Sequence, residues 1–269
     1  MAFDDDHSVA IAGLILPAAL LPAQAPVPHV RTICVKVAPG KTAEYEAYLR
    51  DISLKLLRAR VDDGELLGAD ILRSVEPVGT SARCDYLAVW EYNGFPGEMN
   101  IADRTNALLK KLGMKMTAAE LAAKRDSLST LVGMELWRNV DMVPADEAKG
   151  GYLRLNLYKT KPGKLQAWVD SETKEWKPIV EAYAKDGNVT GWSAWRMLAP
   201  AGDTQAYDAA TADYFPDWAA AGRGLPLTQL WGKVHPNTSI PEWQGRMGAI
   251  RTRPAVELYQ IAEIVAPKK

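Results

Sequence analysis

The chain repeats itself, and this repeat constrains the fold more than any other feature of the sequence. A shift of 123 positions places residues 30–77 on residues 153–200 without a gap. Both copies keep the turn sequence Pro-Gly-Lys, at residues 39–41 and 162–164. Other matching pairs are Asp63-Gly64 with Asp186-Gly187, Gly68 with Gly191, Arg73 with Arg196, Pro77 with Pro200 and, at slightly smaller offsets, Tyr86 with Tyr207, Phe95-Pro96 with Phe215-Pro216, and Glu135-Leu136-Trp137 with Glu257-Leu258-Tyr259. Chance similarity rarely keeps turns and strands in one register over this length, so we predict two modules, 29–143 and 152–269.

Each module is predicted to contain a strand, a helix, two strands, a second helix and a last strand. The first strand is rich in β-branched or alternating residues, and the first helix carries apolar residues at three- and four-residue spacing. Pro178 should kink or break this helix in module 2. The predicted ranges are strands 31–37, 68–75, 86–92 and 134–140 with helices 42–61 and 118–131, then strands 153–159, 191–198, 207–213 and 256–264 with helices 165–185 and 241–250.

This order of elements is the ferredoxin-like βαββαβ motif. One such sheet carries helices on one face only, so its other face must be covered by something else. A second copy in the same chain supplies that cover. We therefore predict an α+β fold in which tandem ferredoxin-like modules pack sheet to sheet.

Outside the modules lie a terminal stretch and a short linker. Residues 9–21 are small and aliphatic but too few to span a bilayer, and Ala23-Gln24-Ala25 matches the A-x-A pattern of signal-peptidase sites. The acidic residues 4–6 stand where a signal peptide carries Lys or Arg, so residues 1–28 are either a signal peptide or an apolar arm. We expect a periplasmic or secreted protein, with a cytoplasmic one as the alternative. The linker, 144–151, is polar.

Composition excludes several classes of function. With 48% hydrophobic residues, 24% charged residues and a net charge of −1, the chain can bury a core and has no overall attraction for nucleic acid. It contains no G-x-S-x-G, phosphate-binding loop, H-E-x-x-H or G-x-G-x-x-G sequence. Cys34 and Cys84 fall on predicted strands. They can form one disulfide after export, but two buried free thiols are the favoured interpretation.

Several short motifs resemble those of one superfamily. Pro-Gly-Lys after the first strand, the stretch 176–179 (Trp-Lys-Pro-Ile), Gly187 and Gly191-Trp192 resemble the dimeric α+β-barrel superfamily, which includes antibiotic-biosynthesis-monooxygenase-like, EthD-like and NIPSNAP-like proteins and exported bacterial members. The resemblance covers nearly everything after Pro28. It implies two facing sheets that enclose a barrel-like cavity, here within one chain. It specifies fold better than function, because the superfamily includes monooxygenases, isomerases, haem enzymes and binding proteins.

The resemblance also bears on cofactors. Haem-dependent relatives need an axial ligand, commonly His. This chain has only His7, His29 and His235, and the first two precede the predicted fold. We therefore expect no cofactor and no metal.

Strand alternation suggests which residues bind a ligand. Arg154, Asn156 and Tyr158 share one face of a strand in module 2, and leucines 153, 155 and 157 share the other. We expect the leucine face to meet the helices and the polar face to line the cavity. The alternative is that Arg154 reaches solvent and Asn156 bonds to the backbone.

A second strand of module 2 adds Trp192 and Arg196, which share a face. An arginine beside aromatic rings can bind a carboxylate or an enolate. The alternative is that Arg73 and Arg196 form ion pairs with the repeat-equivalent Glu135 and Glu257. Seven of the nine tryptophans follow residue 150, which indicates an aromatic-lined pocket in module 2 or a tryptophan-rich core.

His235 and Tyr207 are the candidate catalytic residues, because His titrates near neutrality and Tyr can carry a proton. The alternative for His235 is a surface residue in a loop. Three functions remain open: an exported protein that binds a small hydrophobic or amphipathic molecule, a cofactor-independent monooxygenase or isomerase for aromatic or polyketide-like substrates, and a structural protein that assembles into homo-oligomers.

Overall fold

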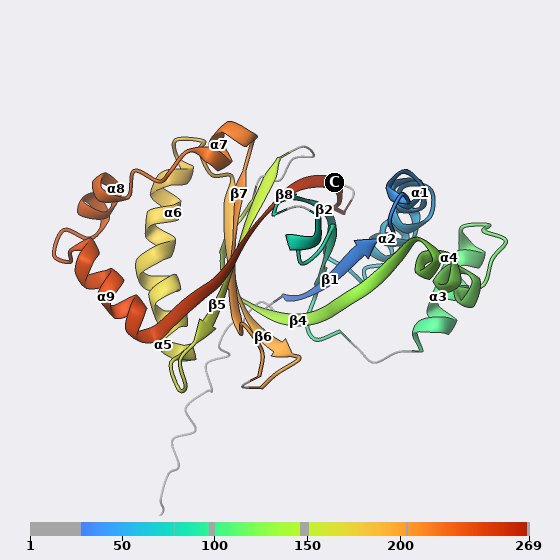
Figure 1. The fold of residues 1–269 in the computed structure, drawn as a ribbon, viewed down its shortest axis with the longest axis horizontal. Helices are drawn as coiled ribbons and strands as arrows, with labels where there is room; N and C mark the ends of the chain where they lie inside the picture. The colour runs from blue at the N-terminus through green and yellow to red at the C-terminus, as the bar shows by residue number, and fades with distance from the viewer. Residues whose placement is uncertain (1–27, 78, 97–99, 146–150, 203, 268–269) are drawn as a thin grey trace, which may run out of the picture.

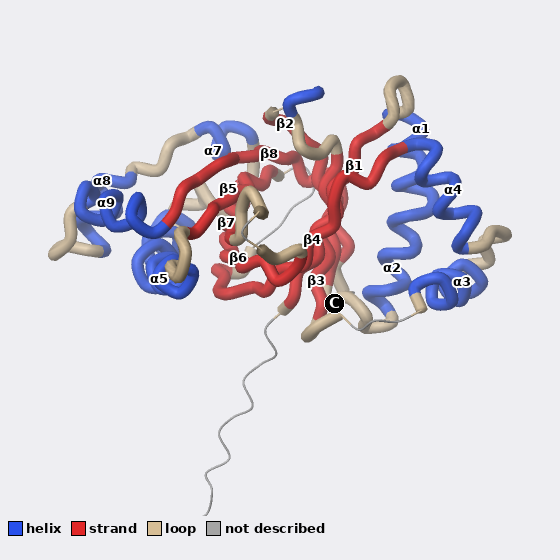
Figure 2. The backbone as a smooth tube through the Cα atoms, turned by 60° about the horizontal axis from the view of Figure 1, so that its bottom comes forward, coloured by secondary structure: helices blue, strands red, loops and turns tan. Residues whose placement is uncertain are grey.

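The computed structural model describes residues 28–77, 79–96, 100–145, 151–202 and 204–267. Its eight strands form one closed antiparallel barrel in the order β1-β3-β2-β8-β5-β7-β6-β4. Figure 1 shows the barrel in the middle, with helices of module 1 on one side and helices of module 2 on the other. The same three-part arrangement is visible in Figure 2. The α+β fold with two ferredoxin-like modules in one chain is thereby confirmed.

The elements follow the predicted order in both modules, with additional helices. Module 1 contains β1 (His29–Val37), α1 (Thr42–Tyr48), η1 (Leu49–Ser53), α2 (Leu54–Asp62), β2 (Gly68–Glu76), η2 (Gly79–Ser81), β3 (Tyr86–Tyr92), α3 (Ile101–Lys111), α4 (Ala118–Leu128) and β4 (Ser129–Val143). Module 2 contains β5 (Tyr152–Thr160), α5 (Leu165–Ser171), η3 (Glu172–Trp176), α6 (Lys177–Ala184), β6 (Gly191–Ala199), β7 (Ala209–Phe215), α7 (Trp218–Gly222), α8 (Leu227–Val234), α9 (Ile240–Ile250) and β8 (Arg251–Val265).

The two sheets are joined at their edges. The long strand β4 pairs with β1 of its own module and with β6 of module 2, where Arg138 lies opposite Arg196. In the same way β8 pairs with β5 and with β2, where Gln260 lies opposite Arg73. Every strand therefore has two neighbours, so the barrel has no free edge.

Strand register confirms part of the sequence alignment and corrects another part. Glu135 lies opposite Thr32, and Glu257 lies opposite Leu155, which is 123 positions after Thr32. Glu135 and Glu257 are therefore equivalent, as predicted. In β3 and β7, however, Tyr92 lies opposite His29, and Phe215 lies opposite Tyr152.

The offset of 123 thus persists through β3 and β7. Tyr86 is equivalent to Ala209, because their partners Val35 and Tyr158 are equivalent. The predicted match of Tyr86 with Tyr207 is wrong by two residues. The loops before these strands are equally long in the two modules, so the false match arose because a tyrosine happens to lie two positions before Ala209.

The barrel interior holds an apolar core built from both modules. It contains Leu153, Leu155 and Leu157 beside residues of module 1 such as Val30 and Leu87. The prediction that the leucine face of this strand meets the helices is therefore wrong. The two sheets need apolar partners across the barrel. The outer face of the module 2 sheet packs against mainly aromatic and aliphatic helix residues, but it also meets the buried Glu172.

A disulfide joins two neighbouring parts of this core. Cys34 of β1 bonds to Cys84, just before β3, and both residues are buried. The favoured interpretation of two free thiols is therefore wrong. Their strand positions did not reveal that the β2–β3 loop returns to β1.

The long first helix of each module contains a π-helical turn at the same repeat position. The turn η1 starts at Leu49 and η3 starts at Glu172, 123 positions later. Pro178 follows η3 as the second residue of α6. The turn in module 1 has no proline nearby, so Pro178 is not the cause of this irregularity.

The predicted signal peptide or arm lies almost wholly in residues 1–27, outside the described residues, as does most of the linker. Among the described residues, no helix is both long enough and apolar enough to cross a membrane.

Candidate functional site

A cavity of about 930 Å³ lies between the outer face of the module 1 sheet and the helices that cover it. This volume falls within the range of small-molecule sites. Strand β1 contributes Arg31, Ile33 and Val35, which alternate with the barrel-facing residues of the same strand. Strand β3 contributes alternate residues from Tyr86 to Tyr92, and α1 to α4 form the opposite wall.

The same space in module 2 is filled. A tightly buried cluster there contains Trp168, Trp192, Trp231 and Trp243. Trp192 occupies the position of Ala69 in module 1, so an indole stands where the first module has a methyl group. Most of the tryptophan excess of module 2 is thus core packing, and the predicted location of the main cavity in module 2 is wrong.

One end of the module 1 cavity is rich in arginine. This arginine end consists of Arg31, Arg60 and Arg104 together with one carboxylate, Glu65. Arg60 and Arg104 both form ion pairs with Glu65, and Arg60 Nη2 also donates to the Tyr92 hydroxyl at 3.3 Å. Burial alone would lower the pKa of Arg60, but its bond to Glu65 outweighs this effect and raises it.

Arg31 differs from its two neighbours. Its guanidinium carbon lies 5.5 Å from the ring centroid of Tyr92. Among the described residues it forms no ion pair with a carboxylate. In module 2 the equivalent Arg154 lies in the same way over Phe215, at 4.8 Å. The stacking of arginine on this aromatic residue is therefore a feature of both repeats.

Trp90 is central to the arginine end. Arg60 covers its ring, with the guanidinium carbon 4.4 Å from the ring centroid. Within the described part of the chain, the buried indole Nε1–H has no hydrogen-bond acceptor. A buried donor without a partner is costly, and a ligand acceptor in the cavity would satisfy it.

The other end of the cavity is rich in tyrosine. This tyrosine end consists of Tyr45, Tyr48 and Tyr86, and the rings of Tyr45 and Tyr86 lie 5.0 Å apart. The Tyr86 hydroxyl donates to Glu46 at 2.7 Å. Burial raises the pKa values of Tyr45 and Tyr86 well above the ordinary value. Both are therefore neutral phenols at physiological pH and offer flat apolar surface with a polar tip.

The ligand-binding residues predicted in module 2 do not line this cavity. Asn156 is buried and donates through Nδ2 to Asp213 at 2.9 Å and to Thr211 at 3.2 Å. Arg154 donates to the backbone carbonyl of Ala221. Trp192 is fully buried in the core of module 2. These side chains face the helices.

Tyr158 belongs to a buried polar cluster that sequence patterns did not reveal. Its ring lies under Arg251, with the guanidinium carbon 3.7 Å from the centroid. Arg251 in turn pairs with Glu172 at 3.3 Å. Burial raises the pKa of Glu172 to about 7, although Arg251 opposes the shift. Glu172 begins the π-helical turn η3, and its counterpart in module 1 is the apolar Leu49, so no repeat pattern indicated a charge here.

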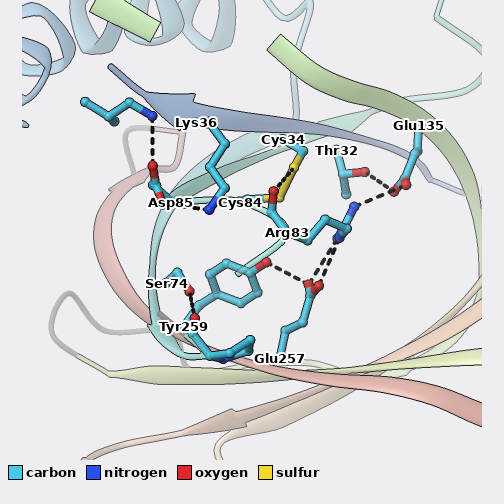
Figure 3. Close-up of a disulfide and its surroundings, with 12 residues drawn as sticks. Thr32, Cys34, Lys36, Ser74, Arg83, Cys84, Asp85, Glu135, Glu257 and Tyr259 are labelled. Atoms are coloured by element: carbon cyan, nitrogen blue, oxygen red, sulfur yellow. Dashed lines mark hydrogen bonds and ion pairs between the residues drawn. A yellow bond between two sulfur atoms is a disulfide. The ribbon is translucent and has the colours of Figure 1, made fainter. Parts of the chain in front are cut away.

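The predicted ion pairs of Arg73 and Arg196 with the two equivalent glutamates are absent among the described residues. A different arginine, Arg83, binds both: Nη1 lies 3.2 Å from Glu135, and Nε lies 3.0 Å from Glu257. Figure 3 shows this arginine between the two carboxylates, next to the disulfide. Sequence comparison missed Arg83 because the equivalent position in module 2 is Ala206, so the repeat does not mark the arginine.

Tyr207 completes this network instead of facing the cavity. Its hydroxyl donates to Glu135 and accepts from Arg83 Nη1 at 3.0 Å. Burial and the nearby Glu135 carboxylate raise the pKa of Tyr207 above the ordinary value, while Arg83 opposes them. The phenol therefore stays neutral. A proton carrier near pH 7 needs a pKa closer to that pH.

His235 lines neither the module 1 cavity nor the Arg83 network. Its Nε2 is 2.8 Å from the backbone carbonyl oxygen of Glu175, and its ring packs against Trp231. The structure thus places the two candidate catalytic residues apart, one in the barrel interior and one among the helices of module 2.

The cavity does not fit haem ligation by histidine. No histidine is among the described residues that line it. The described residues also contain no cluster of three or more His, Cys, Asp or Glu side chains that could hold a metal ion.

Comparison with known proteins gives similarity of structure. No family model and no curated protein matches the chain. A proposed monooxygenase from Lactobacillus acidophilus NCFM has 9% sequence identity and a TM-score of 0.53, over 89% of this chain and 96% of that one. A proposed monooxygenase from Fusobacterium nucleatum has 9% identity and a TM-score of 0.51, over 89% and 94%. An anthrone oxidase-like protein has 12% identity and a TM-score of 0.53, over 90% and 93%. At such low identity the likeness shows the fold alone.

Proposed function

We propose that the chain is a small-molecule-binding α+β-barrel protein whose ligand occupies the cavity of module 1. The observation that carries this proposal is the contrast between equivalent spaces in the two repeats. Module 2 fills its space with indole rings, whereas module 1 keeps about 930 Å³ between the same elements. Aromatic walls and a few converging polar groups are typical of ligand sites.

An open cavity also argues against a purely structural role. If the chain served only to assemble, side chains would be expected to fill the space in module 1 as they do in module 2, because unfilled space reduces stability. The exposed apolar residues Leu131, Val132 and Met134 of β4 remain available for contacts between copies.

The neutral fluorescent probe N-phenyl-1-naphthylamine tests the proposal, because its emission rises in apolar cavities. Ala88 lines the cavity between Tyr86 and Trp90, so Ala88→Phe should reduce probe binding at least tenfold by filling the site. Ala123→Phe is the matched control, since Ala123 is exposed on α4 and should bind like the parent chain. Absence of binding, or equal binding by both variants, would reject the cavity as the binding site.

A second candidate function is a cofactor-independent monooxygenase or isomerase. The descriptions of the structural neighbours as proposed monooxygenases and an anthrone oxidase-like protein support it. The arginine end could hold the anion that forms when an anthrone loses a proton. The test is oxygen consumption with an anthrone, whose CH₂ group becomes a carbonyl while O₂ supplies one oxygen atom to it and one to water. No consumption above the rate of Ala88→Phe would count against this activity.

Export is part of the proposal. The Cys34–Cys84 disulfide supports it, because disulfides persist mainly in oxidising compartments. Expression of the full chain in a bacterium with a periplasm, followed by intact mass measurement, tests it. Cleavage after Ala25 and recovery in the periplasm are expected, whereas an uncleaved cytoplasmic protein would contradict export.

A further inference from the structure

We infer that the ligand of the module 1 cavity carries a single oxyanion, such as a carboxylate or sulfonate, which binds at the arginine end while an aromatic body lies along the tyrosine end. This inference rests on the proposed function and names the chemical class of its ligand. It follows from an imbalance of charge and hydrogen bonding within the cavity wall.

The arginine end of the cavity has more arginines than carboxylates. Arg31, Arg60 and Arg104 line the arginine end together with Glu65. The other acidic residue of the described lining, Glu135, is already paired with Arg83. Arg60 and Arg104 share the Glu65 carboxylate. Arg31 lies against the Tyr92 ring without an ion pair in the described chain. Three guanidinium groups facing one carboxylate leave excess positive charge in a partly desolvated wall, which favours an anion.

The hydrogen bonding of the cavity wall also favours an anion, because a donor there lacks an acceptor. The buried Nε1–H of Trp90 has no acceptor among the described residues. Trp90 lies directly opposite Arg31 across the β1–β3 pair, so the unpaired donor and the unpaired guanidinium lie on adjacent strands. An oxyanion accepts several hydrogen bonds and could use both groups, whereas a neutral apolar molecule would leave the indole unpaired.

The tyrosine end of the cavity has no such excess of unpaired positive charge. Arg125 also lines the cavity. Its charge partly offsets the raised pKa of Tyr45, which places Arg125 at the tyrosine end. It is already paired with Asp126 at 2.8 Å. The aromatic rings of this end therefore suit the uncharged body of the ligand, and the anion is directed to the opposite end.

Two fluorescent probes that share one aromatic skeleton and differ only in charge test the inference. They separate the effect of the charge on binding from the effect of molecular shape. 1-Anilinonaphthalene-8-sulfonate is N-phenyl-1-naphthylamine with one sulfonate added. We expect the full chain to bind the sulfonate probe about tenfold more tightly, in line with one charge-assisted hydrogen bond. Arg31→Gln should remove that preference, because it should weaken binding of the sulfonate probe about tenfold more than binding of the neutral probe. Arg31→Lys, which keeps the charge, should retain most of the preference.

Arg125→Gln is the matched control, because it removes a guanidinium from the same cavity at the end that should not hold the anion. It should keep the preference for the sulfonate probe. Far-ultraviolet circular dichroism would verify that each variant is folded, and Arg104→Gln offers a second variant at the arginine end should Arg31→Gln fail to fold.

The outcomes distinguish the two proposals. If neither probe binds, or if Ala88→Phe does not weaken binding, the proposed cavity function is rejected. Equal affinity for both probes, with both blocked by Ala88→Phe, keeps the cavity function and overturns the inference about the anion. A sulfonate preference that survives Arg31→Gln but is lost in Arg125→Gln overturns the assignment of the anion to the arginine end.

Discussion

Glu135 and Glu257 occupy equivalent positions in the two repeats, and a single guanidinium, that of Arg83, binds both. Thr32 donates to Glu135 at 2.9 Å, and Tyr259 donates to Glu257 at 2.7 Å. Two repeat-equivalent carboxylates thus share one arginine, which has no counterpart in module 2. This arrangement ties the modules together through charge as well as through shared strands.

Arg83→Met is expected to lower the free energy of unfolding by roughly 3–5 kcal/mol, because it leaves two largely buried carboxylates unpaired. Urea unfolding at pH 7 measures the loss. The triple variant Arg83→Met/Glu135→Gln/Glu257→Gln should recover most of it, since no buried charge then remains unpaired. A loss below about 1 kcal/mol in the single variant would mean that the network is solvated.

Loss of the disulfide should destabilise the protein without changing its fold. The bond closes a loop with a sequence separation of 50 residues. The chain-entropy estimate for such a loop is about 4 kcal/mol. Thermal unfolding with and without reductant should show a lower midpoint for the reduced protein. Cys34→Ala/Cys84→Ala should unfold at that lower midpoint in both conditions; a midpoint that still responds to reductant would point to another cause.

The stability contributed by Glu172 should fall as the pH rises. Burial raises its pKa to about 7 in the native state, so between pH 4.5 and 7 the folded chain holds a proton that the unfolded chain has lost. Stability is therefore lost through this window, by roughly 3 kcal/mol. Glu172→Gln places a neutral amide, which does not titrate, at this position.

The measurement is urea unfolding of Glu172→Gln and the parent chain at pH 4 and pH 8. The variant should become more stable relative to the parent at the higher pH. Glu181→Gln, at an exposed position on α6, is the control and should show no such trend. A relative stability that is independent of pH would show that Glu172 stays ionised throughout.

Trp192→Ala should be among the most destabilising single substitutions in module 2. The indole is fully buried between the sheet and its helices, and removing it leaves a void worth roughly 3–5 kcal/mol. Trp218→Ala is the matched control because Trp218 is 53% exposed, so its loss should change stability little. Urea unfolding of the two variants compares them directly, and similar costs would contradict the assignment of Trp192 to the core.

The fold was accessible from the sequence because the repeat kept its turns and strand register. Pro-Gly at residues 39–40 and 162–163 marks the same turn twice, with Gly40 and Gly163 at φ of 74° and 71°. The equivalence of Glu135 and Glu257 could also be recognised, because it depends on strand spacing alone. The π-helical turns could not be foreseen, since no residue type marks their positions in both copies.

The site was harder to predict for a physical reason. Alternation along β5 separates leucines from polar residues, but it does not say which face meets the helices. Here Glu172 supplies a buried carboxyl group from the helix side, so the polar face could turn outward to meet it. Likewise, the number of tryptophans in module 2 indicated aromatic surface without showing whether it surrounds a ligand or fills the interior.

Joining the two halves in one chain has a consequence for how such a barrel can change. In a homodimer every substitution is present twice, so enlarging a ligand chamber in one subunit also enlarges it in the other, and both losses of stability add. Here the β4–β6 and β8–β2 pairings keep the two-subunit architecture within a single gene product. Each half is free to accumulate its own substitutions. One half can then lose interior contacts to accommodate a ligand while the other half gains contacts. The stability gained in one half compensates for the stability lost in the other.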